Sequence, residues 1–319
     1  MKMIDDNIDW NAYVNDENDG RADVRRASEF FDKVKLGFHG EEESVTGMTT
    51  PWPSVGDDIR FRKGEVTLWA GVNGHGKSGV LGQVVLGFMA QGDRVTVASM
   101  EMPADKTLRR MASQAAGQPR PGVQYLDALE SWTDDRLWIY NHIGTVQRDR
   151  MISVSRYCSR ELGVGHMVID SLMKCGIAPD DYAGQKAFVD SLCSLARDTG
   201  LHVHLVHHIR KGEKETNAPD KFDIKGAGEI TDLVDNVLIV HRNKRKEEAL
   251  ASDLKPGERE KYEAQSDTLL ICAKQRHHTW EGKVKLWFDR GSLQFTDERN
   301  SLLHLDLEKN QWRNVWSRG

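Results

Sequence analysis

The sequence predicts an α/β fold in which a mostly parallel sheet is flanked by helices and ends in antiparallel edge strands toward the C-terminus. Three observations predict it. Short apolar runs rich in β-branched residues recur from residue 64, stretches with helical patterning separate several of them, and a glycine-rich turn follows the first run. Runs that are apolar on both faces are typical of buried parallel strands. The runs are residues 65–71, 94–100, 166–171, 201–208, 236–241 and 268–274.

The composition is that of an ordinary globular protein. The 319 residues are 39% hydrophobic and carry a formal net charge of -5, which excludes a chain that coats nucleic acid with its whole surface but allows a local basic loop. No apolar run is long enough to span a membrane, and the N-terminus is acidic, so we expect an intracellular protein without a membrane partner. The four cysteines lack paired spacing and are expected to be reduced.

The chain divides into four regions. Residues 1–20 hold six acids and one lysine and predict a flexible acidic tail. Within residues 21–60, apolar side chains at helical spacing predict a helix that ends at Gly37, followed by a linker or strap rich in Gly, Pro and Thr. The main α/β domain is expected at residues 61–300, with a charged helical insertion at 242–265, and residues 301–319 are expected to form a C-terminal tail.

The glycine-rich turn matches the phosphate-binding pattern G-x-x-x-x-G-K-[ST]. It lies between a predicted strand and a predicted helix, where backbone N–H groups surround phosphate oxygens at a helix N-terminus. Lys77 is expected on the β and γ phosphates, and the Ser78 hydroxyl on Mg²⁺. The plain alternative is a flexible turn. The nucleotide-binding residues that we predict are Gly71, Asn73, Gly74, His75, Gly76, Lys77, Ser78 and Gly79.

Two carboxylates complete the predicted site. Asp170 ends an apolar strand, at the edge where open α/β sheets bind ligands, and is expected to complete the metal site with Ser78. Glu101 follows the strand at 94–100 and is the candidate that orients or deprotonates the attacking water. Each carboxylate has a second interpretation, since Asp170 could cap a helix and Glu101 could help to start the helix that opens at Pro103.

Five blocks in this order resemble the replicative hexameric DNA helicases of the DnaB type. They are the glycine-rich turn, SMEMPADKTLRRMAS at 99–113, VIDSLMK at 168–174, residues 207–243, and AKQRHH at 273–278. The sequence is also similar to the helicase half of phage and mitochondrial primase-helicases, to which the histidine of HHIRK is closer. The resemblance implies a RecA-like core that uses ATP and Mg²⁺, with Glu101 as the catalytic glutamate.

The resemblance assigns His208 as the polar sensor that couples the γ-phosphate to the DNA-binding loop. A buried core histidine is the alternative, and that interpretation is favoured for His202 and His204 on the same strand. Tandem histidines occur at 207–208 and 277–278, but without a carboxylate or cysteine at ligand spacing we expect no metal other than Mg²⁺.

In AKQRHH, the resemblance assigns Lys274 and Arg276 as residues that reach the γ-phosphate of a neighbouring subunit, with Arg276 as an arginine finger. The alternative is a basic pair that protects an exposed edge strand from aggregation. If the finger is correct, each active site lies between two subunits of a ring.

The segment from Lys211 to Lys225 is expected to face the channel of that ring. With Arg210 it carries five basic and four acidic side chains, so its net charge of only about +1 gives little bulk attraction for DNA. We therefore expect backbone contacts to single-stranded DNA from Lys211, Lys225, Gly226 and Gly228, because glycine lets a phosphate approach the main chain. Phe288 and Arg290 are expected near the adenine.

These observations predict an ATP-dependent helicase that translocates on single-stranded DNA as a ring, expected to be a hexamer, in a bacterium or a phage-infected host cell. The 5′→3′ direction is what the resemblance implies. By the resemblance, the helix at 21–37 corresponds in position to the linker helix that packs on the neighbouring subunit in DnaB-type rings. A primase, a polymerase or a loader would act in trans. Two alternatives remain open: a RecA-like recombinase or recombination mediator that forms filaments on DNA, and a nucleotide-switched ring without motor activity.

Overall fold

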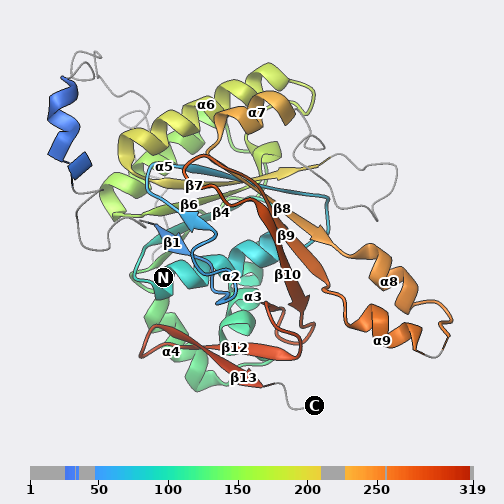
Figure 1. Cartoon of the computed structure of the whole chain (residues 1–319). Helices are drawn as coiled ribbons and strands as arrows, with labels where there is room; N and C mark the ends of the chain where they lie inside the picture. Colours follow the sequence, from blue (N-terminus) through green and yellow to red (C-terminus); the bar gives the residue numbers. More distant parts are fainter. Residues whose placement is uncertain (1–25, 33, 36–46, 210–226, 256, 317–319) are drawn as a thin grey trace.

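A nine-stranded mixed sheet organises the part of the chain that the computed structural model describes, which is residues 26–32, 34–35, 47–209, 227–255 and 257–316 (Figure 1). The strand order is β11-β10-β9-β8-β3-β7-β6-β4-β5. The strands are β3 (Val66–Gly71), β4 (Val95–Ser99), β5 (Leu137–Ile139), β6 (His166–Asp170), β7 (His202–His208), β8 (Asn236–Arg242), β9 (Thr268–Gln275), β10 (Gly282–Phe288) and β11 (Phe295–Thr296).

Parallel pairing joins the six strands from β8 to β5, whereas β9, β10 and β11 add to the β8 edge in antiparallel register. Every residue of β3, β4 and β6 is buried, as expected for strands covered on both faces. The predicted fold class is therefore confirmed. The short strands β5 and β11 were not predicted, because three- and two-residue strands carry too little pattern.

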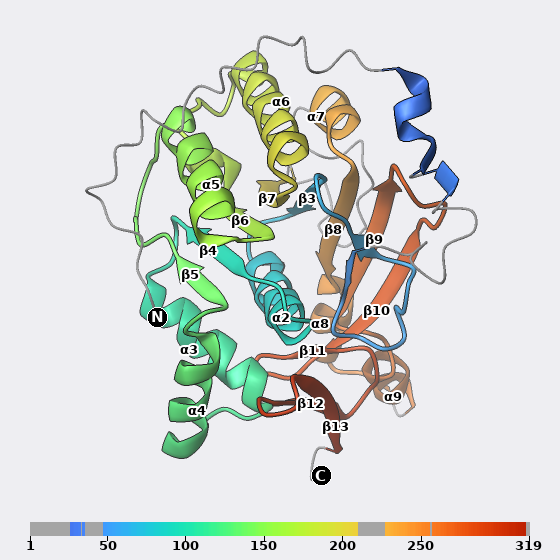
Figure 2. The same cartoon turned by 90° about the vertical axis from the view of Figure 1, so that its left-hand side faces the viewer.

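Helices cover both faces of the sheet (Figures 1 and 2). One core lies under α2 (Lys77–Ala90), α3 (Ala104–Ala116) and α4 (Val123–Thr133). The other lies under α5 (Arg148–Leu162), α6 (Tyr182–Thr199) and α7 (Ala227–Leu233). In α6, the Asp181 side chain caps the N-terminus by accepting from the Gly184 N–H, and Gly200, at a φ of 74°, ends the helix. Among the described residues, none of the helices is long and apolar enough to cross a membrane.

The segment before β3 belongs to the domain, which corrects the boundary expected at residue 61. It contains β1 (Met48–Thr49) and β2 (Arg60–Phe61), which pair in antiparallel fashion. Trp52 is 1% exposed and donates from Nε1 to the Phe295 carbonyl at 2.7 Å, and Val55 and Ile59 are buried in the same core. This part of the expected strap is thus built into its own subunit because its apolar side chains fill the core.

Of the helix predicted at 21–37, the structure describes the 3-10 turn η2 (Ala27–Phe30) and helical residues at 31–32 and 34–35. Phe31 and Val34 belong to the predicted apolar stripe and are exposed. The acidic tail at 1–20 lies outside the described residues.

Residues 301–316 form a β-hairpin rather than the expected tail. Strands β12 (Ser301–Asp306) and β13 (Gln311–Trp316) pair in antiparallel register, and Leu303 and Leu305 on one face of β12 are buried in the core that α3 also covers. The alternation of buried and half-buried residues in β12 explains why this segment folds onto the domain. The charged insertion at 242–265 contains two short helices, α8 (Lys244–Leu250) and α9 (Glu258–Glu263), as predicted.

Candidate functional site

The glycine-rich turn connects β3 to α2 and requires glycine at specific points. A Cβ on Gly71 would lie 2.6 Å from the Val240 carbonyl oxygen, and Gly76 caps α2 at a φ of 89°. The exposed residues Asn73 and Gly74 form the outer part of the turn, while His75 is buried and accepts from the Arg242 N–H at 3.3 Å. The turn therefore places the N-terminus of α2 at the C-terminal edge of the sheet, as a phosphate cradle requires.

Lys77 lies inside this turn. It is 5% exposed, and its Nζ donates to the Gly71 carbonyl at 2.7 Å and to the Val72 carbonyl at 3.1 Å. Burial lowers the pKa of Lys77 to about 8, although the carboxylates of Asp170 and Glu101 oppose the shift. At neutral pH the ammonium is thus charged and held by loop carbonyls.

Ser78 and Asp170 meet beside Lys77, as predicted. The Ser78 hydroxyl donates to Asp170 Oδ2 at 2.6 Å. Asp170 ends β6 and is buried, which raises the pKa of its carboxyl, while the hydrogen bond from Ser78 acts in the opposite direction. A hydroxyl and a carboxylate with oxygen donors fit Mg²⁺, which takes few protein ligands and completes its shell with water and phosphate. Among the described residues, no group of three or more His, Cys, Asp or Glu side chains could hold another metal.

Glu101 lies at the same edge, in the connection between β4 and α3. It is exposed, and its Oε1 accepts from the Ser171 hydroxyl at 3.1 Å. The helix that follows is capped at Pro103 and starts at Ala104, so Glu101 is outside the helix and its carboxylate is held by the residue after Asp170. The geometry brings Glu101 near Lys77 and Asp170, whose pKa values it shifts.

His208 ends β7 and lies opposite Gly71 in the parallel ladder. Burial, followed by the nearby charge of Lys77, lowers the pKa of His208 to about 4, so the imidazole is neutral at pH 7. Its Nδ1 is buried without a hydrogen-bond partner among the described residues. The neutral imidazole thus has a ring nitrogen, Nδ1, that makes no hydrogen bond to the described residues, at a position beside the turn.

His202 and His204 of β7 are core residues, as the sequence favoured. His202 and His204 are fully buried. His202 Nε2 lies 2.8 Å from Thr67 Oγ1, and Trp69 donates to His204 Nδ1 at 3.2 Å. Burial lowers the pKa of both histidines, to about 3 for His202.

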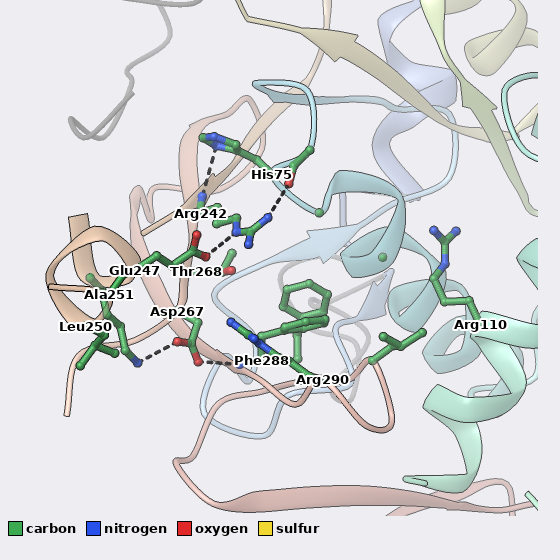
Figure 3. Close-up of a pocket in the computed structure, with 16 residues that line it drawn as sticks. His75, Arg110, Arg242, Glu247, Leu250, Ala251, Asp267, Thr268, Phe288 and Arg290 are labelled. Atoms are coloured by element: carbon green, nitrogen blue, oxygen red, sulfur yellow. Dashed lines mark hydrogen bonds and ion pairs between the residues drawn. The ribbon is translucent and has the colours of Figure 1, made fainter. Parts of the chain in front are cut away.

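A cavity of about 540 Å³ opens beside the turn (Figure 3). Phe288 and Arg290 line it, where an adenine was expected. The predicted turn residues Gly74, His75, Gly76 and Gly79 form part of the wall. Residues that sequence reasoning missed form the rest, above all Arg242 at the end of β8, which donates to the Gly74 carbonyl at 3.4 Å and pairs with Glu247 of α8. The insertion therefore lines the cavity as well as facing solvent.

Arg110 was also missed. It projects from α3 into the space between this cavity and Asp170, and burial lowers the pKa of its guanidinium despite the nearby Asp170 carboxylate. Its Nε has no hydrogen-bond partner among the described residues. The basic pair at 109–110, on the helix that follows Glu101, was the available signal.

Lys274 and Arg276 lie at the opposite end of the sheet. Lys274 is paired with Val237, at the start of β8, which lies beside the start of β3. The Lys274 ammonium donates to the Thr231 and Val234 carbonyls at 2.7 Å, and Arg276 donates to the Leu233 carbonyl at 2.9 Å, so both cap the C-terminus of α7. The length of β3 separates them from their own Lys77 by on the order of 15–20 Å.

The predicted DNA contacts Lys211, Lys225 and Gly226 lie outside the described residues. Gly228 is exposed in the first turn of α7. These assignments therefore remain predictions.

The sequence and the structure of this chain are similar to those of several known proteins. A family model described as an AAA domain matches residues 51–214. One similar protein is a DNA helicase/primase of Enterobacteria phage T3, which is 22% identical over 206 residues that cover 58% of this chain and 36% of that protein. Another is a Twinkle homolog protein, chloroplastic/mitochondrial, of Arabidopsis thaliana, which is 23% identical over 240 residues that cover 68% of this chain and 33% of that protein. The chain thus spans about a third of the length of these relatives.

Two solved structures share the fold. The ATPase domain of G40P superposes with a TM-score of 0.71 at 16% identity and covers 86% of this chain and 100% of that domain. A DnaB-like replicative helicase, in a study of its interactions with primase, superposes with a TM-score of 0.67 at 15% identity and covers 86% of this chain and 67% of that one.

Proposed function

The chain belongs to the AAA domain family, and on that premise we propose that it is an ATP-driven DNA helicase of the DnaB type that translocates on single-stranded DNA as a ring. One observation carries the proposal. A triphosphate cradle with Lys77, Ser78, Asp170 and Glu101 lies at one end of the sheet, while Arg276 lies at the other. Such a chain completes its site only with a neighbour. The name of the phage relative, a DNA helicase/primase, supports the helicase activity.

Hydrolysis uses the groups at the C-terminal edge of the sheet. Lys77 exchanges the Gly71 and Val72 carbonyls for β- and γ-phosphate oxygens of ATP. Ser78 and Asp170 would hold Mg²⁺, which neutralises charge on the triphosphate. Glu101, steadied by the Ser171 hydroxyl, orients and deprotonates the attacking water. His208, beside the turn, transmits the state of the γ-phosphate to the segment that follows β7.

The second half of each site comes from the neighbouring subunit. The Arg276 side chain is 39% exposed, and its contacts include an ion pair with Asp235 and a hydrogen bond to the Leu233 carbonyl. The guanidinium can therefore exchange these contacts for a γ-phosphate bound by the neighbouring subunit, with Lys274 beside it. We propose a hexameric ring. The exposed Phe31 and Val34 of the N-terminal helix would pack on the next subunit and join the subunits.

DNA would pass through the ring channel along the segment from Lys211 to Gly228, held by its phosphates, in the 5′→3′ direction. A primase, a polymerase or a loader would act with it in trans. We propose that the protein acts in the cytoplasm of a bacterium or of a phage-infected cell, where DNA and these partners are present.

The test is unwinding of a forked DNA duplex with ATP, using forks that lack either the 5′ or the 3′ tail. We expect unwinding only when the 5′ tail is present, and none with Lys77→Ala. Absence of unwinding, together with open filaments on single-stranded DNA in electron micrographs, would establish the recombinase alternative instead. ATP hydrolysis that single-stranded DNA does not stimulate would favour a ring without motor activity.

A further inference from the structure

A buried glutamine of α2 holds the wall of the cavity beside the glycine-rich turn. Gln83 is 0% exposed, and its side-chain amide makes both bonds to one residue: Nε2 donates to the Phe295 carbonyl at 2.8 Å, and Oε1 accepts from the Phe295 N–H at 2.8 Å. Gln83 and Phe295 are 212 residues apart in the sequence. Because a buried amide without partners is costly, this pair of bonds fixes Phe295 against α2.

A second buried glutamine makes a similar connection from α3. Gln114 is 0% exposed, and its Nε2 donates to the Gly79 carbonyl at 2.9 Å and to the Leu293 carbonyl at 2.8 Å. Gly79 lies in the first turn of α2, immediately after Ser78. The segment that leads into β11 is therefore tied to the helix turn that bears the phosphate-binding residues.

The Phe295 ring fills the space between these two attachments. A Cβ on Gly76 or on Gly79 would lie 3.1 Å from this ring, so the ring is in contact with the phosphate turn. On its other side it packs against Phe288, with ring centroids 4.8 Å apart. Phe288 faces the cavity of about 540 Å³ (Figure 3). The contacts thus run from the phosphate turn through Phe295 to the aromatic wall of the cavity.

We propose that Gln83 and Gln114 are positioning residues that set the aromatic wall of Phe288 and Phe295 at a fixed distance from the phosphate turn, and thereby determine the part of nucleotide affinity that comes from the base. The inference rests on the proposed function, in which this turn and cavity hold a nucleoside triphosphate. Gln83 makes both of its side-chain bonds to Phe295 and none to the residues of the phosphate turn. Its loss therefore acts on the base and leaves Lys77 and Ser78 in place.

The test compares a ligand with a base to one without. Calorimetry gives the Kd of ATP and of inorganic tripolyphosphate, both with Mg²⁺, for the wild-type protein and for Gln83→Met, which keeps the side-chain volume and removes the amide. We expect the Kd of ATP to rise about tenfold, as for the loss of one or two neutral hydrogen bonds, and that of tripolyphosphate to stay within about twofold. The KM for ATP should rise with a nearly unchanged kcat.

Gln91→Met is the matched control, because Gln91 lies at the other end of α2. It bonds with its side-chain amide to both backbone groups of Thr49, at 2.9 Å and 3.0 Å, far from the cavity. It should lower stability without changing the ratio of the two Kd values. If Gln83→Met does not fold, Gln114→Met removes the other attachment and must give the same shift in the ratio.

Four results are decisive. Equal weakening of ATP and tripolyphosphate, or no weakening of either, would overturn the inference, since the glutamines would then be structural only. A selective loss of ATP binding in a protein that hydrolyses no ATP would support the inference and refute the proposed motor. A wild-type protein that does not bind ATP would overturn both.

Discussion

The position of Arg276 gives the sharpest prediction, which is that Arg276→Ala abolishes ATP hydrolysis while the subunit stays folded. Within its own subunit, Arg276 donates to the carbonyls of Asp232 and Leu233 and pairs with Asp235 at 3.3 Å. Its side chain is 39% exposed, so these contacts contribute less than about 1 kcal/mol to folding. Loss of an arginine finger costs at least about 10³-fold in kcat, or roughly 4 kcal/mol in the activation barrier.

The assay is hydrolysis by mixtures of two inactive variants. Arg276→Ala keeps Lys77, and Lys77→Ala keeps Arg276, so a subunit of the first type beside one of the second type rebuilds a complete site. If equal amounts assemble at random, roughly a quarter of the interfaces are complete, and hydrolysis should recover to a similar fraction of the wild-type rate. Urea unfolding of each variant is the control for stability. No recovery in rings that demonstrably contain both variants would refute the trans assignment of Arg276.

Three further predictions follow from individual residues. Glu101→Gln should lower kcat by about 10²- to 10⁴-fold with little change in the Kd of ATP, because it removes the base and not a phosphate contact; equal loss of binding in calorimetry would contradict this. Acid should destabilise the fold through His202, because its pKa is about 3 in the folded protein and 6.5 in the unfolded chain. The unfolded state therefore binds a proton first, and the free energy of unfolding falls as pH drops below about 6.5. Urea unfolding at pH 5 and 7.5 should show a smaller difference in His202→Gln than in the wild type. Trp52→Ala should cost about 3–5 kcal/mol in the free energy of unfolding, because it empties a buried site and removes the bond to Phe295, and a loss below about 1 kcal/mol would show that residues 47–61 are a detachable strap.

The sequence predicted the central sheet because its strands are continuous apolar runs, which only a doubly covered sheet accommodates. It placed the first domain boundary too late because the segment around Trp52 is rich in Pro, Gly and Thr, a composition typical of linkers. Burial of that segment depends on Phe295, a partner 243 residues away, and local patterning carries no such information. The hairpin at 301–316 did have a local signal, the alternation in β12, but it is only six residues long.

The candidate site likewise contains residues that the sequence predicted and residues that it did not. Lys77 and Ser78 lie in one motif, and Asp170 and Glu101 follow strands, so a parallel sheet brings them together at one edge without further assumptions. Arg110 and Arg242 escaped prediction because each comes from an element whose place beside the cavity follows from helix packing and strand order. Lys274 and Arg276 were assigned through family resemblance, and the sheet register now supplies a physical reason why they are too far from their own Lys77 to serve it.

The separation of the phosphate turn and Arg276 by the length of β3 limits which assemblies can be active. In head-to-tail association, each subunit would place its phosphate turn against the Arg276 of one neighbour and its own Arg276 against the phosphate turn of the other. An open row of subunits always leaves one cradle without a finger and one finger without a cradle at its ends. Closing the row into a ring pairs these two ends, so the last contact to form would also be the one that gives every subunit a complete site.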